Sequence, residues 1–66
     1  MLINGAYVTI DGRYIANPDT KETCKAKSKA HFFTSVYRAE DYAATLEEET
    51  GKDVSFFIAR KNVDFQ

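Results

Sequence analysis

Residues 36–50 repeat apolar side chains at the spacing of an α-helix, and this segment limits the fold more than any other part of the chain. Ser35 or Thr34 can cap its N-terminal end, and Gly51 suits the left-handed residue that ends many helices. The apolar positions fall within a stripe about 120° wide. They are Val36, Ala39, Tyr42, Ala43, Leu46 and Thr50. A helix with one such stripe needs a sheet or a second helix to cover it, and we expect a sheet.

The residues before this helix supply strands. Residues 2–10 read LINGAYVTI and are rich in strand-forming side chains. They end at Asp11-Gly12, a dipeptide that favours the left-handed backbone of a tight hairpin turn. Residues 13–16 should therefore pair back on the first strand, and residues 17–20, Asn-Pro-Asp-Thr, should form a second turn.

Residues 23–33 alternate between two kinds of side chain, which predicts a long third strand. One face would carry Lys25, Lys27, Lys29, His31 and Phe33. The other face would carry Cys24, Ala26, Ser28, Ala30 and Phe32. The small residues would leave room for the helix, and the lysines would face water or a partner. A helix over KETCKAKSKA is the main alternative, because lysine and alanine are good helix formers.

Residues 54–59, VSFFIA, are apolar on both alternating faces. That pattern suits a central strand, or a strand whose second face is covered by a partner, and it draws attention to Phe57. The tail, residues 60–66, still carries Val63 and Phe65, so it should extend this strand or pack loosely.

These elements predict a fold of the α+β class: a single small domain over residues 1–66, in the order β-β-β-α-β, with one helix packed on a 3-4 stranded antiparallel sheet. A chain of 66 residues is too short for a second core, since it buries only about 60% of its unfolded surface. Five Phe and four Tyr supply much of the apolar area. The thin core also suggests a homodimer as an extra source of burial.

Cysteine usage and the N-terminal residues bear on the compartment. Cys24 is the only cysteine, so no internal disulfide can form, and with His31 alone it cannot make a structural zinc site. The first ten residues lack the pattern of a signal peptide, and no run approaches the ~20 apolar residues of a membrane span. We therefore expect a cytoplasmic protein that binds no metal and no membrane.

The sequence offers no catalytic constellation, so we expect a protein that is not an enzyme. On one strand Cys24 and His31 would point to opposite faces, so the imidazole could not activate the thiol. The three consecutive glutamates at 47–49 splay around a helix instead of converging. The three glycines are isolated, which argues against a phosphate loop, and no cofactor is expected.

The lysines of residues 25–29 are the first candidate for recognition. On a strand, Lys25, Lys27 and Lys29 would recur every ~6.6 Å, close to the spacing of phosphates in an extended nucleic-acid strand. His31 and Phe33 would continue that face, and Phe33 could stack on a base. The pI of about 5.7 argues against nucleic acid, as does the common use of lysine to protect a sheet edge.

The outer face of the helix is the second candidate, and it is acidic. Tyr37, Asp41 and Glu48 lie on it, with further glutamates on both sides. Residues 1–33 carry five basic and three acidic side chains, whereas residues 34–66 carry four basic and seven acidic ones. An aromatic anchor inside a charged rim is typical of a protein-binding surface. The candidate anchors are Tyr37, Tyr7, Tyr14, Phe33 and Phe57.

No motif identifies a family. In size, in element order and in the segment TSVYRAEDYAATLEEETGK, the chain resembles short accessory proteins of bacteria and their phages, including inhibitors that block host defence systems. The resemblance covers the layout and transfers no site residue. It implies a protein-binding accessory or inhibitor, encoded by a phage or mobile element, that obstructs a larger machine of the host. The alternative is a small nucleic-acid-binding protein that uses the lysine face.

Overall fold

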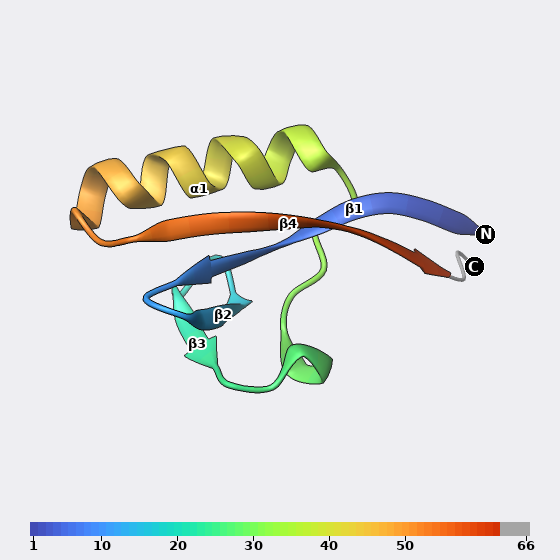
Figure 1. The fold of residues 1–66 in the computed structure, drawn as a ribbon, viewed down its shortest axis with the longest axis horizontal. Coiled ribbons are helices and arrows are strands. Elements are labelled where there is room, and N and C mark those ends of the chain that lie inside the picture. Colours follow the sequence, from blue (N-terminus) through green and yellow to red (C-terminus); the bar gives the residue numbers. More distant parts are fainter. Residues whose placement is uncertain (63–66) are drawn as a thin grey trace.

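The computed structural model describes residues 1–62, so the expectation for Val63 and Phe65 lies outside the described residues. Four strands form one antiparallel sheet in the order β3-β2-β1-β4, and one helix lies across it (Figure 1). The elements are β1 (Leu2–Ile10), β2 (Arg13–Asn17), β3 (Glu22–Cys24), the 3-10 helix η1 (Lys27–Lys29), α1 (Val36–Thr50) and β4 (Val54–Asn62). The predicted α+β class, element order and single helix on an antiparallel sheet are confirmed.

The hairpin between β1 and β2 turns at the predicted dipeptide. Ile10 pairs with Arg13, and the two residues between them have positive φ angles, 50° at Asp11 and 79° at Gly12. Two positive φ angles in a two-residue loop match the right-handed twist of the flanking strands. The second turn also forms as expected, because the side-chain oxygen of Asn17 accepts a hydrogen bond from the backbone N–H of Asp19 at 2.9 Å.

The prediction of a long third strand over residues 23–33 is wrong. β3 has only three residues, and Lys27–Lys29 form a 3-10 turn, which is all that remains of the helical alternative. The reason lies in the partner strand. Cys24 pairs with Tyr14, and because the two strands are antiparallel, the residue after Cys24 comes opposite Arg13, the first residue of β2. Beyond that point a continued strand would have no neighbour to satisfy its backbone.

After the 3-10 turn the chain returns to the sheet at β1. The backbones of Ala6 and Phe33 exchange two hydrogen bonds, both of 2.9 Å, so residue 33 occupies the place beside β1 that β2 has vacated. This pairing turns Phe33 toward the helix. Its side chain is 8% exposed and belongs to the core, in contrast to the solvent-facing position that strand alternation predicted.

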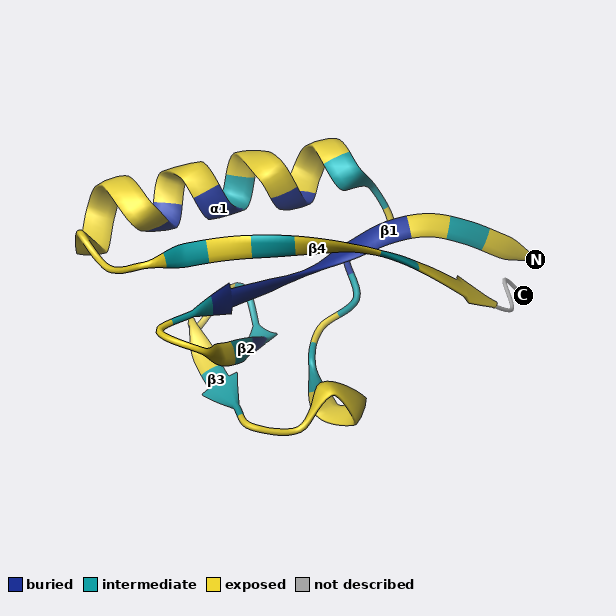
Figure 2. Cartoon of the chain, viewed as in Figure 1, coloured by how far each residue is buried: buried dark blue, intermediate teal, exposed yellow. Residues whose placement is uncertain are grey.

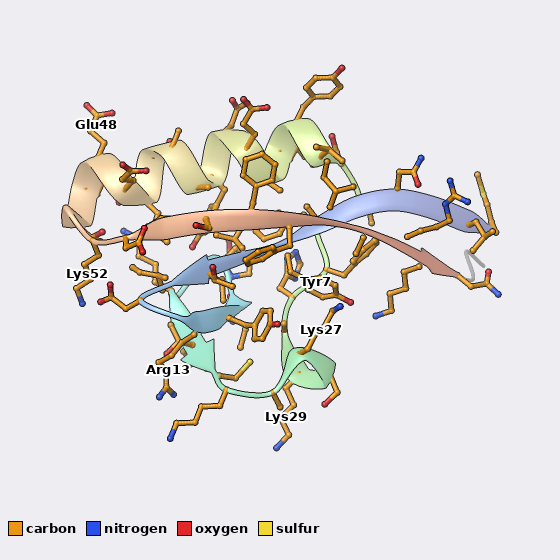
Figure 3. All side chains as sticks on the ribbon, viewed as in Figure 1. Tyr7, Arg13, Lys27, Lys29, Glu48 and Lys52 are labelled. Carbon is orange, nitrogen blue, oxygen red and sulfur yellow. The ribbon has the colours of Figure 1, made fainter. Side chains whose placement is uncertain are left out.

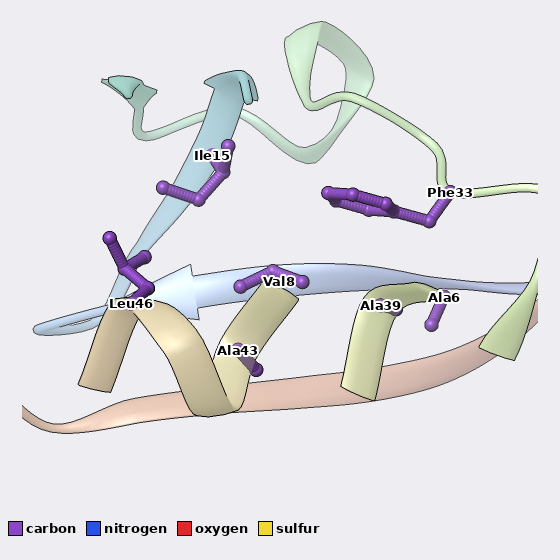
Figure 4. Packing of buried hydrophobic residues seen from close by; sticks show 7 residues of the cluster. All are labelled: Ala6, Val8, Ile15, Phe33, Ala39, Ala43 and Leu46. Atoms are coloured by element: carbon purple, nitrogen blue, oxygen red, sulfur yellow. The ribbon is translucent and has the colours of Figure 1, made fainter. Parts of the chain in front are cut away.

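α1 packs on the sheet through the predicted stripe (Figures 2 and 4). The buried cluster joins helix residues to residues of β1 and β2 and to the returning chain. It contains Ala6, Val8, Ile15, Phe33, Ala39, Ala43 and Leu46. The helix begins after Ser35 and ends at Gly51, whose φ of 68° confirms the expected left-handed cap. Thr50 is exposed, and its hydroxyl donates to the carbonyl of Leu46, so the stripe stops one turn earlier than predicted.

β4 continues past residues 54–59 to Asn62, so residues 60–62 extend the strand, which is one of the two outcomes expected for the tail. It is an edge strand, not a central one. It pairs with β1 over nine residues, from Val54 opposite Ile10 to Asn62 opposite Leu2. β1 is the central strand, buried continuously from Gly5 to Thr9, because α1 covers one face and the returning chain covers part of the other. No helix within residues 1–62 is long and apolar enough to cross a membrane.

Candidate binding surface

The face of the sheet opposite α1 carries aromatic side chains from four parts of the chain: β1, β2, β4 and the segment that returns to the sheet before α1. Residues opposite each other in a ladder share a face, and successive residues alternate. Ala6 and Val8 face the helix, so Tyr7 and its ladder partner Phe57 face away from it. Tyr14 joins them from β2, where it is opposite Thr9. We call this surface, made by Tyr7, Tyr14, Phe32 and Phe57, the helix-free face.

Phe32 reaches the helix-free face because position 5 is a glycine. A β-carbon at Gly5 would come within 2.6 Å of the ζ carbon of Phe32 and would also collide with the carbonyl oxygen of Phe33. Without a side chain there, the ring of Phe32 lies against β1. Its ring makes an edge contact with the ring of Tyr7, with 5.4 Å between the ring centres. The ring of Tyr14 also makes an edge contact with Tyr7, with 6.2 Å between the centres.

Two lysine amino groups lie over these rings. The Nζ of Lys27 is 5.3 Å from the centre of Tyr7, and the Nζ of Lys61 is 5.5 Å from the centre of Phe32. Both distances allow cation–π attraction, worth about 0.5–1 kcal/mol at exposed sites. The helix-free face is therefore aromatic with positive charge on it.

The predicted row of lysines does not exist as a row. Lys25, Lys27 and Lys29 are all exposed, but they surround a 3-10 turn instead of sharing one strand face. Lys27 lies beside Tyr7, whereas Lys29 points away from the sheet (Figure 3). His31 is exposed, and its ring meets the ring of Phe33 edge-on with 4.7 Å between centres. It lies on the helix side, because Phe33 does.

The acidic residues of α1 lie on the opposite side of the molecule from the lysines of the helix-free face. Tyr37 is 81% exposed, and Asp41 and Glu48 are also exposed on the helix. Figure 3 shows Glu48 on the outer side of α1 and Lys27 and Lys29 beyond the other side of the sheet. The chain therefore carries two charged surfaces of opposite sign with the hydrophobic core between them.

One ion pair ties the helix to the turn before β3. The amino group of Lys21 donates to a carboxylate oxygen of Glu49 at 2.6 Å. This hydrogen bond, with the attraction between the two charges, raises the pKa of Lys21. Nearby, the hydroxyl of Tyr42 donates to the carbonyl of Pro18 at 3.0 Å, and burial raises the pKa of that phenol. Both contacts hold α1 in place and lie away from the helix-free face.

Three of the aromatic anchors expected from the sequence, Tyr7, Tyr14 and Phe57, lie together on the helix-free face. The alternation of Tyr7 with Ala6 and Val8 on the first strand is the signal for its place there. Lys61 lies beyond residues 54–59, so the alternation of the predicted strand assigns it no face, whereas the structure pairs it with Ile3 on β1. Phe32 was expected on the small-residue face toward the helix.

Two observations on residues 1–62 concern metal binding and the thiol of Cys24. Residues 1–62 hold no group of three or more His, Cys, Asp or Glu side chains that could bind a metal ion. The thiol of Cys24 donates a hydrogen bond to the carbonyl of Ala26 at 3.2 Å. Aromatic and aliphatic contact with a rim of positive charge is the chemistry that the helix-free face offers.

Comparisons with protein families, curated proteins and solved structures found no match to this chain.

Proposed function

We propose that this chain is a non-enzymatic protein-binding accessory or inhibitor protein, and that the helix-free face is its docking surface. Phe57 carries the proposal. Its side chain is 54% exposed on β4, although it is opposite the buried Tyr7 in the ladder. A half-exposed aromatic ring beside other aromatic rings and a charged rim is the usual composition of a binding hot spot.

The charge of the helix-free face supports a partner with an acidic surface. Lys27 and Lys61 lie over the aromatic rings, and Lys25 and Lys29 lie on or beside the adjoining turn. Opposite charges across an interface speed association and exclude wrong partners more than they add affinity. The acidic outer face of α1 would repel such a partner, so docking should occur in one orientation.

The size and layout of the chain suit obstruction of a larger machine. The described residues make one four-stranded sheet with a single helix, and the sheet face without a helix is open to a partner. An inhibitor that a phage or mobile element directs against a host defence or nucleic-acid-processing machine needs no more than such a face. This part of the proposal depends on layout, and the docking surface does not depend on it.

Affinity capture from a nuclease-treated bacterial lysate tests the proposal when the wild type is compared with two variants. Phe57→Ser removes the exposed ring of the helix-free face, and Tyr37→Ser removes an exposed ring of α1 as the matched control. We expect a protein that is retained by the wild type and by Tyr37→Ser but lost with Phe57→Ser. Equal retention by all three chains would contradict the proposal.

Single-stranded nucleic acid is a second candidate for the same face, because amino groups above aromatic rings also suit a phosphate backbone with stacked bases. The burial of Tyr7 argues against it, since a ring that is 8% exposed cannot stack on a base. Titration of a labelled oligonucleotide decides the question. Binding that weakens steeply with salt, and that Lys27→Glu reduces for every sequence, would favour nucleic acid. Failure to bind at low salt would remove this candidate.

A further inference from the structure

The outer edge of β4 exposes backbone hydrogen-bonding groups. No strand within residues 1–62 pairs with that edge. The N–H and C=O of Ala6 both bond to Phe33, so they point away from β4. In an antiparallel ladder the residue opposite such a position, here Ile58, directs its own N–H and C=O outward. The same holds two residues away, at Phe56 and Arg60.

The middle of this edge, residues 54–59, lacks the features that usually protect an edge strand. Residues 54–59 contain no proline and no charged side chain, and the nine-residue ladder between β4 and β1 keeps one regular register. Arg60 and Lys61 lie toward the end of the strand. Its middle carries two large exposed apolar side chains, Phe57 at 54% and Ile58 at 69%. At the other edge of the sheet, β3 has three residues and an irregular register, so it offers little to pair with.

We propose that a second copy of this chain pairs with the β4 edge, antiparallel, about a two-fold axis at Phe57. In this register Phe57 lies opposite Phe57 of the second copy, and Phe56 lies opposite Ile58 twice. Aromatic and β-branched residues opposite each other are among the favourable cross-strand pairs. Asp53, just before the strand, lies opposite Lys61, so two pairs of opposite charge close the ends of the interface.

The neighbouring register with Ile58 on the axis is poorer. It places Phe56 opposite Arg60, leaves Phe57 opposite Ala59, and removes Asp53 from Lys61. The register centred on Phe57 also places Arg60 opposite Val54 of the second copy. Val54 comes four residues after the end of α1, so Arg60 approaches the acidic C-terminal turns of that helix. The charge pairs and the cross-strand side-chain pairs therefore both favour the axis at Phe57.

The proposed dimer is a closed assembly, which does not add further copies. The axis makes one self-complementary interface, and within residues 1–62 the edges left in the dimer are the short β3 strands, so we expect assembly to stop at two copies. The two helix-free faces become one continuous face, with both Phe57 rings side by side at its centre. The dimer does not depend on the proposed function, since it follows from the edge and not from the face.

Sedimentation measures whether the dimer forms. One strand pair buries little area, which places the dimer among weak, concentration-dependent interfaces. We expect the wild type to move from monomer to dimer as its concentration rises through the micromolar range. Ile58→Lys should stay monomeric, because it puts like charges at the interface, whereas Leu2→Lys should dimerise as the wild type does. Leu2 is similarly exposed, at 64%, but lies on the inner strand β1. A wild type that stays monomeric at all concentrations would overturn the proposal.

Disulfide trapping tests the register, and the pair of chains that reports the proposed register keeps both Phe57 and Ile58. Two chains are made in a Cys24→Ser background, one with Ser55→Cys and one with Ala59→Cys. Positions 55 and 59 face each other across the axis as a non-hydrogen-bonded pair, whose Cα atoms lie about 4.5 Å apart, within reach of a disulfide. Like positions lie about 13 Å apart along the strand, too far to link.

We expect oxidation to link the two chains only when they are mixed, with the mixed mass seen by mass spectrometry. A link between Phe57→Cys and Ala59→Cys chains, in the absence of one between Ser55→Cys and Ala59→Cys, would overturn the register, since those positions meet only in the register centred on Ile58. The absence of any link would overturn the edge pairing.

Discussion

Gly5 lies directly beneath the ring of Phe32, whose ζ carbon would come within 2.6 Å of a β-carbon at position 5. The same β-carbon would collide with the backbone carbonyl of Phe33, which belongs to the segment that pairs with β1. One missing side chain therefore allows the returning chain to lie on the sheet from both sides: Phe32 on the helix-free face and Phe33 in the core.

Gly5→Ala should destabilise the protein by about 1–3 kcal/mol, the usual cost of overpacking, because a backbone carbonyl cannot give way as a flexible side chain can. Urea unfolding measures this cost. Gly12→Ala is the control: no atom lies within 4 Å of its β-carbon, so its cost of about 1 kcal/mol comes only from a φ of +79°. Near-ultraviolet circular dichroism should change for Gly5→Ala and not for Gly12→Ala. A neutral Gly5→Ala would contradict the packing of Phe32 and Phe33 on β1.

Leu46→Ala should cost about 2–5 kcal/mol, since Leu46 is 2% exposed and removal of its side chain leaves a cavity between α1 and the sheet. Leu2→Ala, at an exposed position, should change the free energy of unfolding by less than about 0.5 kcal/mol. Both values come from urea unfolding at a low protein concentration. Equal effects of the two substitutions would mean that α1 does not pack on the sheet through Leu46.

The ion pair between Lys21 and Glu49 should affect the pKa of Lys21 more than it affects the free energy of unfolding. Both side chains are 51% exposed, so solvent screens their attraction and Glu49→Gln should change stability little. The pKa of Lys21 should fall toward its ordinary value of 10.5 when its hydrogen-bond partner loses its charge. Nuclear magnetic resonance of the lysine side chain follows this titration. Glu48→Gln, on the outer face of the helix, should leave the pKa of Lys21 unchanged.

Stability should fall at alkaline pH. Burial raises the pKa of Tyr42 above 10.0, and the contact with Glu49 raises the pKa of Lys21 above 10.5. A group whose pKa is raised by folding contributes its full stability below its ordinary pKa and loses it as pH rises through the raised value. The urea midpoint should therefore decline above about pH 10. Tyr42→Phe should weaken this decline, whereas Tyr37→Phe should not, and an unchanged decline in both would contradict the role of Tyr42.

The parts of the fold that short-range signals determine were predictable. Asp11-Gly12 needs a positive φ at both residues and makes the hairpin, and Gly51 ends the helix for the same reason. Ala39, Ala43 and Leu46 show the period of a helix that is buried on one side. In each case the information lies within a few residues of the feature.

The third strand could not be predicted in the same way, because its length depends on a partner elsewhere in the chain. The alternation in residues 23–33 is consistent with a strand. However, β2 begins at Arg13, so residues after Lys25 have no residue of β2 opposite them to pair with. Phe33 then reverses its face by pairing with Ala6. The binding surface moved with it, from a row of lysines to Tyr7 and Phe32 with Lys27 and Lys61 above them.

The dissociation constant of the captured partner for the Phe57→Ser chain tests the central claim most directly. If the helix-free face is the docking surface, loss of an anchor worth about 2 kcal/mol should weaken binding roughly 30-fold. Tyr37→Ser should bind as the wild type does. Ile58→Lys, which keeps the Phe57 ring and removes the second copy, should also retain the affinity. An unchanged dissociation constant for Phe57→Ser, or an equal loss for Tyr37→Ser, would contradict docking through this face.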